Sequence, residues 1–324
     1  MRINDLIFRE LIKRGVKQVD KGRLWYLADS KLWYVTPAQA QGYLDLEQSP
    51  EYREGLIQAE IDLIGQNLDA ILSQLPEQKY NLVDLGCGNG EKAAMFIERL
   101  GKKLGIRYCP VDISSYMVSK ALGTVGGLDI DGIVESKENI SDFENLTNVM
   151  PAFRRGGYKG SLVLLLGNTI GNFDREDILE GIYQSMQPQD FLLIGTELRN
   201  DKRIDEIVQE YNSDLVNQFL IHLPRQVGLT EHDVEFEVEF NKDRVDLFYR
   251  IKRDKTVAHL GRKIEFKAGD RILAAISYKY TQDELRDLLE KRFEAKLYPN
   301  QEKNYTLALC RRKMEWENDK EKIS

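Results

Sequence analysis

Residues 80 to 198 alternate between short apolar runs and amphipathic segments, and this alternation constrains the fold more than any other feature of the sequence. Each apolar run has the length and composition of a buried strand, and apolar residues recur at helical spacing in between. Strands are predicted at 80–86, 106–113, 128–136, 160–168 and 190–198, and helices at 91–103, 114–123, 140–150 and 175–186. Because strands that alternate with helices form a parallel sheet covered on both faces, the sequence predicts an α/β domain here.

The sequence on either side of this region follows other patterns. Residues 51–76 have apolar positions at helical spacing and end at Pro76. Residues 234–251 alternate apolar and polar side chains about a polar turn, which is typical of an antiparallel hairpin. Thr281 and Glu284 have the spacing of a capping box, and a helix followed by a last hairpin is predicted from there on. We therefore expect one α/β domain that is interrupted by a smaller, more antiparallel region.

The turn after the first predicted strand contains closely spaced glycines. In "NLVDLGCGNGEKAAMF" the strand carries Asp84, and the turn that follows contains Gly86, Gly88 and Gly90. The chain has no G-x-x-x-x-G-K-[ST] motif, and its G-x-G-x-G spacing differs from the G-x-G-x-x-G of dinucleotide sites. A pyrophosphate avoids a neighbouring carboxylate, whereas the sulfonium and ammonium groups of S-adenosylmethionine (SAM) are attracted to one. The turn therefore favours SAM, with a nicotinamide-dependent oxidoreductase as the alternative.

Further polar residues follow the next predicted elements. Asp112 ends the second strand, where a carboxylate can accept both hydroxyl hydrogens of a ribose. Asp142 is placed for the adenine amino group and Phe143 for the ring, although Asp142 is equally suited to cap the next helix. Lys92, at the start of the first helix, either reaches the carboxylate of the cofactor or is a solvated helix residue. Together with Asp84 these residues form the predicted SAM site.

The overall composition narrows the range of partners. With 46 Lys and Arg against 53 Asp and Glu, the net charge is −7, which disfavours a nucleic acid as the main partner. The three cysteines and three histidines show no metal-ligand spacing, so no metal site is predicted. Neither a signal peptide nor an apolar run of about eighteen residues is recognisable, so we expect a cytoplasmic protein without a membrane partner.

Three longer stretches carry a family resemblance. They are "LLLGNTIGNF" at 164–173, "KLWYVTPAQAQGYLDLEQSPEY" at 31–52 and "GDRILAAISYKYT" at 269–281. With them the chain resembles, over nearly its whole length, the histidine-specific N-alpha-methyltransferases of ergothioneine biosynthesis. The resemblance implies a Rossmann-like, seven-stranded class I methyltransferase sheet and a smaller α+β substrate-binding domain. The methyltransferase domain would comprise 55–197 and 281–312, the substrate-binding domain 1–54 and 198–280, and a charged tail 313–324.

The resemblance also implies an activity and roles for single residues. The chain would be a SAM-dependent N-methyltransferase that acts on the amino group of an amino acid or a related small amine. The residues that correspond to cofactor contacts are Gly86, Lys92, Asp112, Asp142 and Phe143.

On the acceptor side, the resemblance implies a second set of residues. Tyr34 resembles a tyrosine near the reacting amine and the cofactor, and Tyr52 one that contacts the substrate imidazole. Gly167 and Asn172 resemble residues that hold the amino-acid end of the substrate, and Ser277 a second contact to the imidazole. Tyr34 and Asn172 are the predicted catalytic residues.

Two departures from the family pattern concern the acceptor. The histidine enzymes have a glutamate two positions before the serine of "ISYKY", where it pairs with the imidazole, and this chain has Ala275. The segment that joins "GTEL" to "EYNSDL" is short, and we expect it to lack the tyrosine that helps bind the substrate carboxylate. Since a pocket built to hydrogen-bond a polar ring discriminates through its buried polar groups, the predicted acceptor is a less polar amino acid or another primary amine. A SAM-binding homologue without turnover is the alternative.

Overall fold

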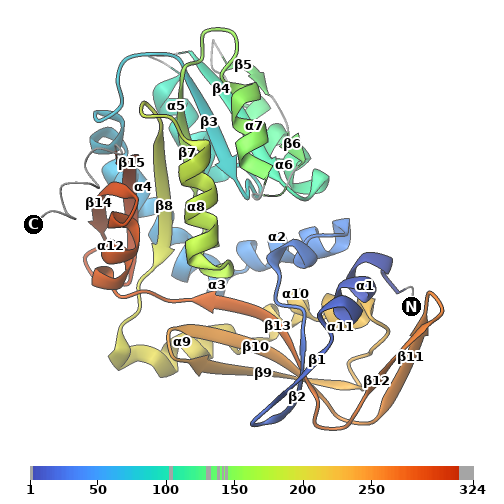
Figure 1. The fold of residues 1–324 in the computed structure, drawn as a ribbon. Coiled ribbons are helices and arrows are strands. Elements are labelled where there is room, and N and C mark those ends of the chain that lie inside the picture. The colour runs from blue at the N-terminus through green and yellow to red at the C-terminus, as the bar shows by residue number, and fades with distance from the viewer. Residues whose placement is uncertain are drawn as a thin grey trace, which may run out of the picture. The chain divides into compact units, whose positions relative to one another are not determined.

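The computed structural model describes residues 3–101, 105–128, 133–136, 139–140, 142 and 145–313. The chain divides into two compact units (Figure 1). Unit 1 comprises Met1–Leu46, Gly171–Phe173 and Asn200–Lys279, and unit 2 comprises Glu47–Ile170, Asp174–Arg199 and Tyr280–Ser324.

Unit 2 is built on one twisted sheet. Its strands, in spatial order, are β14 (Phe293–Pro299), β15 (Tyr305–Arg312), β8 (Phe191–Glu197), β7 (Gly160–Leu165), β3 (Tyr80–Leu85), β4 (Ile106–Asp112) and β5 (Ile133–Ser136). The two-residue strand β6 (Asn139–Ile140) also pairs with β4. Neighbours from β8 to β5 are parallel, whereas β15 is antiparallel to both β8 and β14. The predicted seven-stranded α/β sheet is confirmed, with β6 as a short addition.

Helices cover both faces of this sheet. On one side α4 (Gln58–Leu72), α5 (Glu91–Leu100) and α6 (Ser115–Gly126) pack in sequence, and on the other α7 (Leu146–Phe153) packs against α8 (Arg175–Ser185) (Figure 1). Every position of β3, β4, β7 and β8 is buried, as parallel strands with two covered faces require. The predicted capping box forms at the start of α12 (Gln282–Glu290), where Thr281 and Glu284 cap one another.

The units differ from the predicted boundaries chiefly at residues 47–54 and 171–173, and by one or two residues at 198–199 and 280. Residues 47–54 belong to unit 2, because α3 (Pro50–Tyr52), the π-helical turn η2 (Arg53–Ile57) and α4 form one continuous helical segment that packs on β15. Residues 171–173 belong to unit 1, because Gly171 lies against β13 (Arg271–Tyr278). A Cβ atom on Gly171 would lie 2.9 Å from the carbonyl oxygen of Tyr278, so only glycine allows this approach.

Unit 1 contains a five-stranded, mostly antiparallel sheet. Its strand order is β1 (Val16–Val19), β2 (Gly22–Tyr26), β13, β10 (Arg244–Ile251) and β9 (Val234–Asn241), with only β2 and β13 parallel. The predicted hairpin over 234–251 is β9–β10. A separate ribbon consists of β11 (Lys255–His259) and β12 (Arg262–Phe266), and the helices are α1 (Asp5–Arg14), α2 (Pro37–Gln48), α9 (Ile204–Tyr211), α10 (Asp214–Leu220) and α11 (His222–Gln226). The central strand β13 is buried from Arg271 to Ser277.

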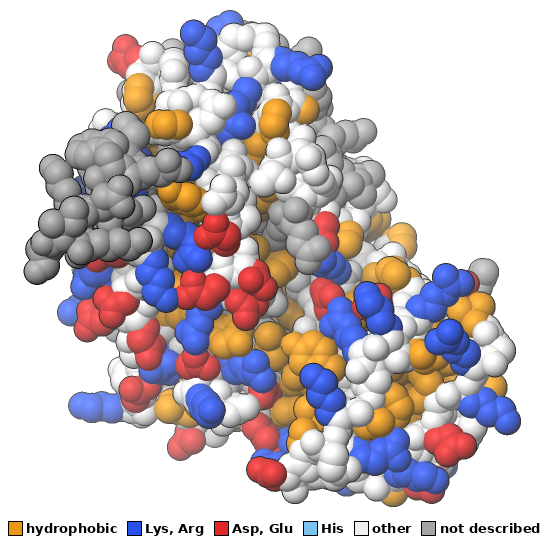
Figure 2. Space-filling view, viewed as in Figure 1, with side chains coloured by type: hydrophobic (Ala, Val, Ile, Leu, Met, Phe, Trp, Pro, Cys, Tyr) orange, Lys and Arg blue, Asp and Glu red, His pale blue; other side chains and the backbone are white. Residues whose placement is uncertain are grey.

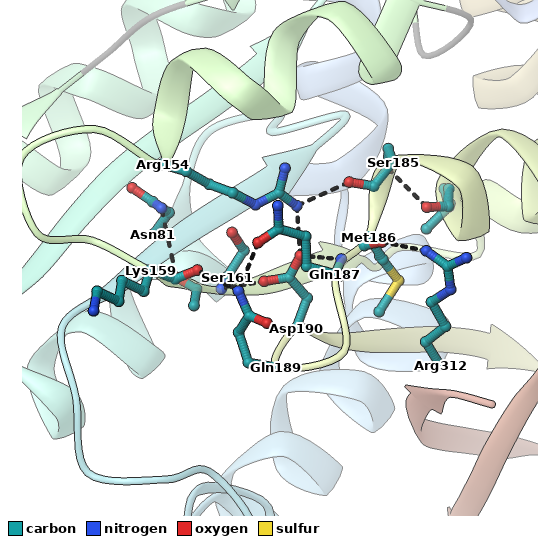
Figure 3. Close-up of polar contacts among 12 residues, drawn as sticks. Asn81, Arg154, Lys159, Ser161, Ser185, Met186, Gln187, Gln189, Asp190 and Arg312 are labelled. Carbon is teal, nitrogen blue, oxygen red and sulfur yellow. Dashed lines mark hydrogen bonds and ion pairs between the residues drawn. The ribbon is translucent and has the colours of Figure 1, made fainter. Parts of the chain in front are cut away.

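A buried polar cluster closes the amino-terminal ends of β7 and β8 in unit 2 (Figure 3). Asp190 is fully buried and accepts hydrogen bonds from the backbone N–H groups of Ser161 and Gln187, both at 2.8 Å. Its other partner is the guanidinium of Arg154 at 2.5 Å, which also donates to the carbonyl oxygen of Ser185. We call these residues, Arg154, Ser161, Ser185, Gln187 and Asp190, the Asp190 cluster. It joins α7, β7, α8 and β8 at one edge of the sheet.

The surface shows charges of both signs side by side. On the face in Figure 2, Lys and Arg side chains are interspersed with Asp and Glu. Several of them form ion pairs, such as Lys291 with Glu176 at 2.6 Å and Arg292 with Glu180 at 2.7 Å. None of the helices in the described part of the chain has the length and hydropathy that a membrane span needs.

Candidate active site

The predicted glycine turn joins β3 to α5 and needs its glycines. Gly86, Gly88 and Gly90 have φ angles of 70°, 52° and 77°, in the left-handed region that glycine tolerates best. A Cβ atom on Gly90 would also lie 2.9 Å from the Cα atom of Ala121 in α6. The turn therefore brings bare backbone to the carboxyl-terminal edge of the sheet, where ligands of open α/β sheets bind.

Asp84 and Asp112 lie at the ends of the neighbouring strands β3 and β4, and both are buried. The hydroxyl of Tyr108 donates to Asp84 at 2.8 Å, and the N–H of Ser114 donates to Asp112 at 2.8 Å. Burial raises the pKa of Asp84 to about 6, against the opposing effects of Tyr108 and Lys92. Burial, with the charge of Asp84 added, raises the pKa of Asp112 to about 7. Two carboxylates with such raised pKa values at one edge of a sheet are typical of a functional site.

Lys92 is held by a residue that the sequence did not point to. Its Nζ atom lies 2.5 Å from Oε2 of Glu60, a glutamate of α4 that is fully buried. Glu60 also accepts hydrogen bonds from the N–H of Gly167, at 2.9 and 3.1 Å to its two oxygens. Lys92 is therefore no solvated helix residue, and two predicted site residues meet at Glu60. No local pattern marks Glu60, which lies at an ordinary helix position 107 residues before Gly167.

For the other predicted site residues of unit 2, the structure gives the backbone position and the burial. Gly167 has a φ angle of 70° and begins the turn after β7. Tyr52 ends α3 and is half-buried, and Asp142 is half-buried with its carbonyl oxygen accepting from the N–H of Asn145. Phe143 lies outside the described residues, so its predicted adenine contact stays a prediction.

In unit 1, Tyr34 belongs to an aromatic cluster with Tyr43 and Phe219, at ring-centroid distances of 5.5 and 5.9 Å. Its neighbour Trp33 donates from Nε1 to the carbonyl oxygen of Ala274 at 3.0 Å. This bond ties the segment of Tyr34 to β13. The extra residue of a β-bulge lies at the same point, because Leu247 pairs with Ala275 while Phe248 pairs with Leu273. Bulges of this kind re-aim side chains beside active sites.

Ser277, also on β13, is part of a buried polar group. The hydroxyl of Tyr211 lies 3.1 Å from Oγ of Ser277, and Nζ of the fully buried Lys279 donates to the same hydroxyl at 2.7 Å. A Cβ atom on Gly171 would lie 3.3 Å from Oγ of Ser277. Asn172 is the next residue, so the backbone before it passes close to Ser277. The segment that joins "GTEL" to "EYNSDL", residues 199–209, contains no tyrosine, and it is Tyr211, the last residue of α9 and part of "EYNSDL", that lies beside Ser277. Helix α9 places it there across 66 residues of sequence.

Ala275, at the position where the resemblance predicts a glutamate in the histidine enzymes, is a buried apolar residue. Ala275 is 3% exposed and pairs with Leu247 on β10. Ala275 and Ser277 lie on the same face of β13, since side chains alternate along a strand. Within the described residues no group of three His, Cys, Asp or Glu side chains could hold a metal ion.

These features fit SAM. A nucleoside with two ribose hydroxyls and a sulfonium cation can donate further hydrogen bonds to the buried Asp112 and bring positive charge to the buried Asp84. The glycine turn leaves room for the methionine part of such a nucleoside. The strand order, with an antiparallel β15 inserted beside β8, is that of class I methyltransferases. The protein is a SAM-dependent methyltransferase.

The sequence profile of the histidine-specific, SAM-dependent methyltransferases matches residues 40–312, so the chain belongs to that family. It is 24% identical over 266 residues to the histidine N-alpha-methyltransferase of Mycolicibacterium smegmatis, covering 76% of this chain and 78% of that protein. It is also 24% identical over 251 residues to ergothioneine biosynthesis protein 1 of Schizosaccharomyces pombe, covering 73% of this chain but only 32% of that protein. A crystal structure of human N-acetylserotonin methyltransferase in complex with SAM superposes with a TM-score of 0.39 at 14% identity, covering 84% of this chain and 59% of that one. Family membership decides the open choice between SAM and a dinucleotide in favour of SAM.

Proposed function

We propose that this methyltransferase acts on the amino group of an amino acid or related small amine whose side chain is less polar than that of histidine. The observation that carries the proposal is Ala275, a buried apolar residue on β13 at the position where the histidine enzymes have a glutamate. A pocket without that carboxylate leaves the N–H of an imidazole unpaired, which costs affinity for histidine.

The proposed roles of the other acceptor residues follow from their surroundings. Asn172 holds the amino-acid end of the acceptor together with Gly167, and Tyr34 borders the path of the methyl group. Ser277 keeps a hydroxyl toward the acceptor side chain, and Tyr211 and Lys279 hold that hydroxyl in place.

On the cofactor side we propose that Asp112 binds the ribose, Asp84 attracts the sulfonium, and Gly86, Gly88 and Lys92 line the methionine part. Asp142 and Phe143 remain proposed contacts of the adenine. SAM supplies the activated methyl group, and the protein aligns the amine and keeps it neutral by excluding water. Methyl transfer of this kind needs no metal ion or covalent nucleophile.

The test is an acceptor screen with the wild-type chain and two variants of one position. The wild type is incubated with methyl-labelled SAM and a pool of amino acids and small amines, and the products are identified by mass spectrometry. We expect a methylated acceptor other than histidine to dominate. In Ala275→Glu, kcat/KM for histidine should rise by about tenfold or more relative to the preferred acceptor, and in the uncharged control Ala275→Gln by less. Trimethylated histidine as the main product of the wild type would overturn the proposal, and no product from any amine would favour a homologue without turnover.

A further inference from the structure

Glu60 is the most deeply buried charged residue beside the proposed cofactor site. It is 0% exposed, on the face of α4 that packs on the sheet. Its carboxylate meets the ammonium of Lys92 at 2.5 Å and the N–H of Gly167 at 2.9 Å. A buried carboxylate is costly unless its charge is paired and its oxygens are hydrogen-bonded, and Glu60 meets both conditions.

The strand behind Glu60 is shaped to admit it. A Cβ atom on Gly195, in the middle of β8, would lie 2.0 Å from Oε1 of Glu60. Gly195 lies inside a regular strand, so the space for the carboxylate explains this glycine. The absence of a side chain at Gly195 therefore leaves space for the carboxylate of Glu60 inside the unit.

The ammonium of Lys92 in turn lies at the turn after β7. A Cβ atom on Gly167 would lie 3.1 Å from Nζ of Lys92, so the ammonium, the carboxylate and the backbone of this turn form one group. We infer that Glu60 is a positioning residue, which fixes the cation of Lys92 and the N–H of Gly167 at the carboxyl-terminal edge of the sheet for the amino-acid end of SAM. The inference rests on the proposed contact between Lys92 and that end of the cofactor.

The charges around Lys92 support this role. Burial by itself lowers the pKa of Lys92, but Glu60, with Glu47 and Asp84, outweighs burial and raises it. Glu91, the neighbour of Lys92 in α5, has its main partner in Arg53 at 2.6 Å, although the charge of Lys92 also acts on it. Without the charge of Glu60, Lys92 would lose its nearest counter-ion and give up its proton at lower pH. Glu60 thus keeps Lys92 a cation that can bind a carboxylate.

The experiment compares two ligands that differ only at the end in question. S-adenosylhomocysteine has the amino-acid end, and 5′-methylthioadenosine lacks it. Calorimetric titrations of the full chain at pH 7 and pH 9 are made with the wild type, Lys92→Met, Glu60→Gln and Glu60→Asp. Lys92→Met first tests the proposed contact: it should weaken S-adenosylhomocysteine by about tenfold or more and 5′-methylthioadenosine by less than twofold. If both ligands bind Lys92→Met as they bind the wild type, the proposed contact of Lys92 fails, whatever Glu60 does.

Given that contact, Glu60→Gln should weaken S-adenosylhomocysteine by about tenfold at pH 9 relative to the wild type at the same pH, and by less at pH 7. Its affinity for 5′-methylthioadenosine should stay within twofold. Glu60→Asp keeps the charge, so its loss should not grow between pH 7 and pH 9, and it serves as the second variant if Glu60→Gln fails to fold. Equal losses for both ligands would show that Glu60 only supports the fold, and an unchanged affinity for S-adenosylhomocysteine in both Glu60 variants would also overturn the inference.

Discussion

Asp190 and Asp112 are both buried aspartates of unit 2, and they lie at opposite ends of the same sheet. They differ in the hydrogen-bond donors and the charged groups that surround them. Asp190 receives two backbone N–H groups and the guanidinium of Arg154 (Figure 3). Asp112 receives backbone N–H groups from the turn that follows it, and the charge beside it is another carboxylate, Asp84. Burial, with the charge of Asp84 added, raises the pKa of Asp112 to about 7.

The difference teaches how a structural polar cluster can be told from a binding site. In the Asp190 cluster the protein itself satisfies the buried charge, so the cluster gains nothing from a ligand. At the other end of the sheet, none of the described residues places a cation in comparable contact with Asp112, so we expect a ligand that donates hydrogen bonds there to stabilise its charge. The following predictions test this contrast.

The largest effect is expected from Asp190→Ala. The change leaves the guanidinium of Arg154 buried without its carboxylate, which costs about 3–5 kcal/mol of unfolding free energy. Urea unfolding followed by circular dichroism measures it. Affinity of the folded protein for S-adenosylhomocysteine should stay within about twofold, and a large loss of affinity with unchanged stability would reverse the two roles.

Asp112→Asn should show the opposite pattern. Loss of a charged acceptor for the ribose hydroxyls should weaken S-adenosylhomocysteine by about 1.5–3 kcal/mol, as measured by calorimetry. The unliganded protein should become more stable, because the variant no longer buries a charge. Since the native pKa of an acid is raised here, the wild type loses stability as pH rises from about 4 to 7, so the gain should be larger at pH 8 than at pH 5. An unchanged affinity would remove Asp112 from the site.

The same ionisation predicts a pH dependence of cofactor binding. The ribose hydroxyls need an ionised Asp112 to accept their hydrogens, and the carboxyl ionises with a pKa of about 7. Affinity for S-adenosylhomocysteine should therefore rise by about tenfold between pH 6 and pH 8 in the wild type. Titrations of Asp112→Asn over the same range provide the control, and an equal rise in that variant would assign the effect to another group.

The smallest effect is expected from Asp84→Asn, which keeps an oxygen for the hydroxyl of Tyr108 and removes only the charge. If Asp84 attracts the sulfonium, SAM should lose about 0.5–1 kcal/mol more than S-adenosylhomocysteine, which has no sulfonium. Competition binding of the two ligands measures this difference. Identical losses would show that Asp84 acts on the fold or on another part of the cofactor.

Much of unit 2 was predictable because its signals are local. The predicted strand 80–86 appears as β3 with one residue fewer, and the glycine turn adopts the left-handed φ angles that its sequence suggests. The predicted strand 160–168 ends earlier, at Leu165, because Gly167 and Asn168 adopt positive φ angles of 70° and 58°. The predicted helix 140–150 is shifted to α7, which continues through Pro151, because Phe153 is completely buried and extends the apolar face.

The residues of the candidate site that lie at the ends of parallel strands could be predicted from the sequence, and the others could not. Asp84 and Asp112 end neighbouring parallel strands, so an argument from strand order alone brings them to one edge. The pairing of Tyr211 with Ser277 and Lys279 depends on how α9 packs against β9 and β10, the latter being the neighbour of β13, and nothing local in the sequence marks it.

The sequence by itself determined the alternating strands and helices, the glycine turn and the acids at the strand ends, because each follows from backbone preferences and side-chain spacing over a few residues. Only the tertiary structure decided that Glu60 joins Lys92 to Gly167, that Gly195 leaves it room, and that residues 171–173 lie against β13. These contacts join segments far apart in the chain, which only packing brings together, and among them the buried charge of Glu60 requires its partners.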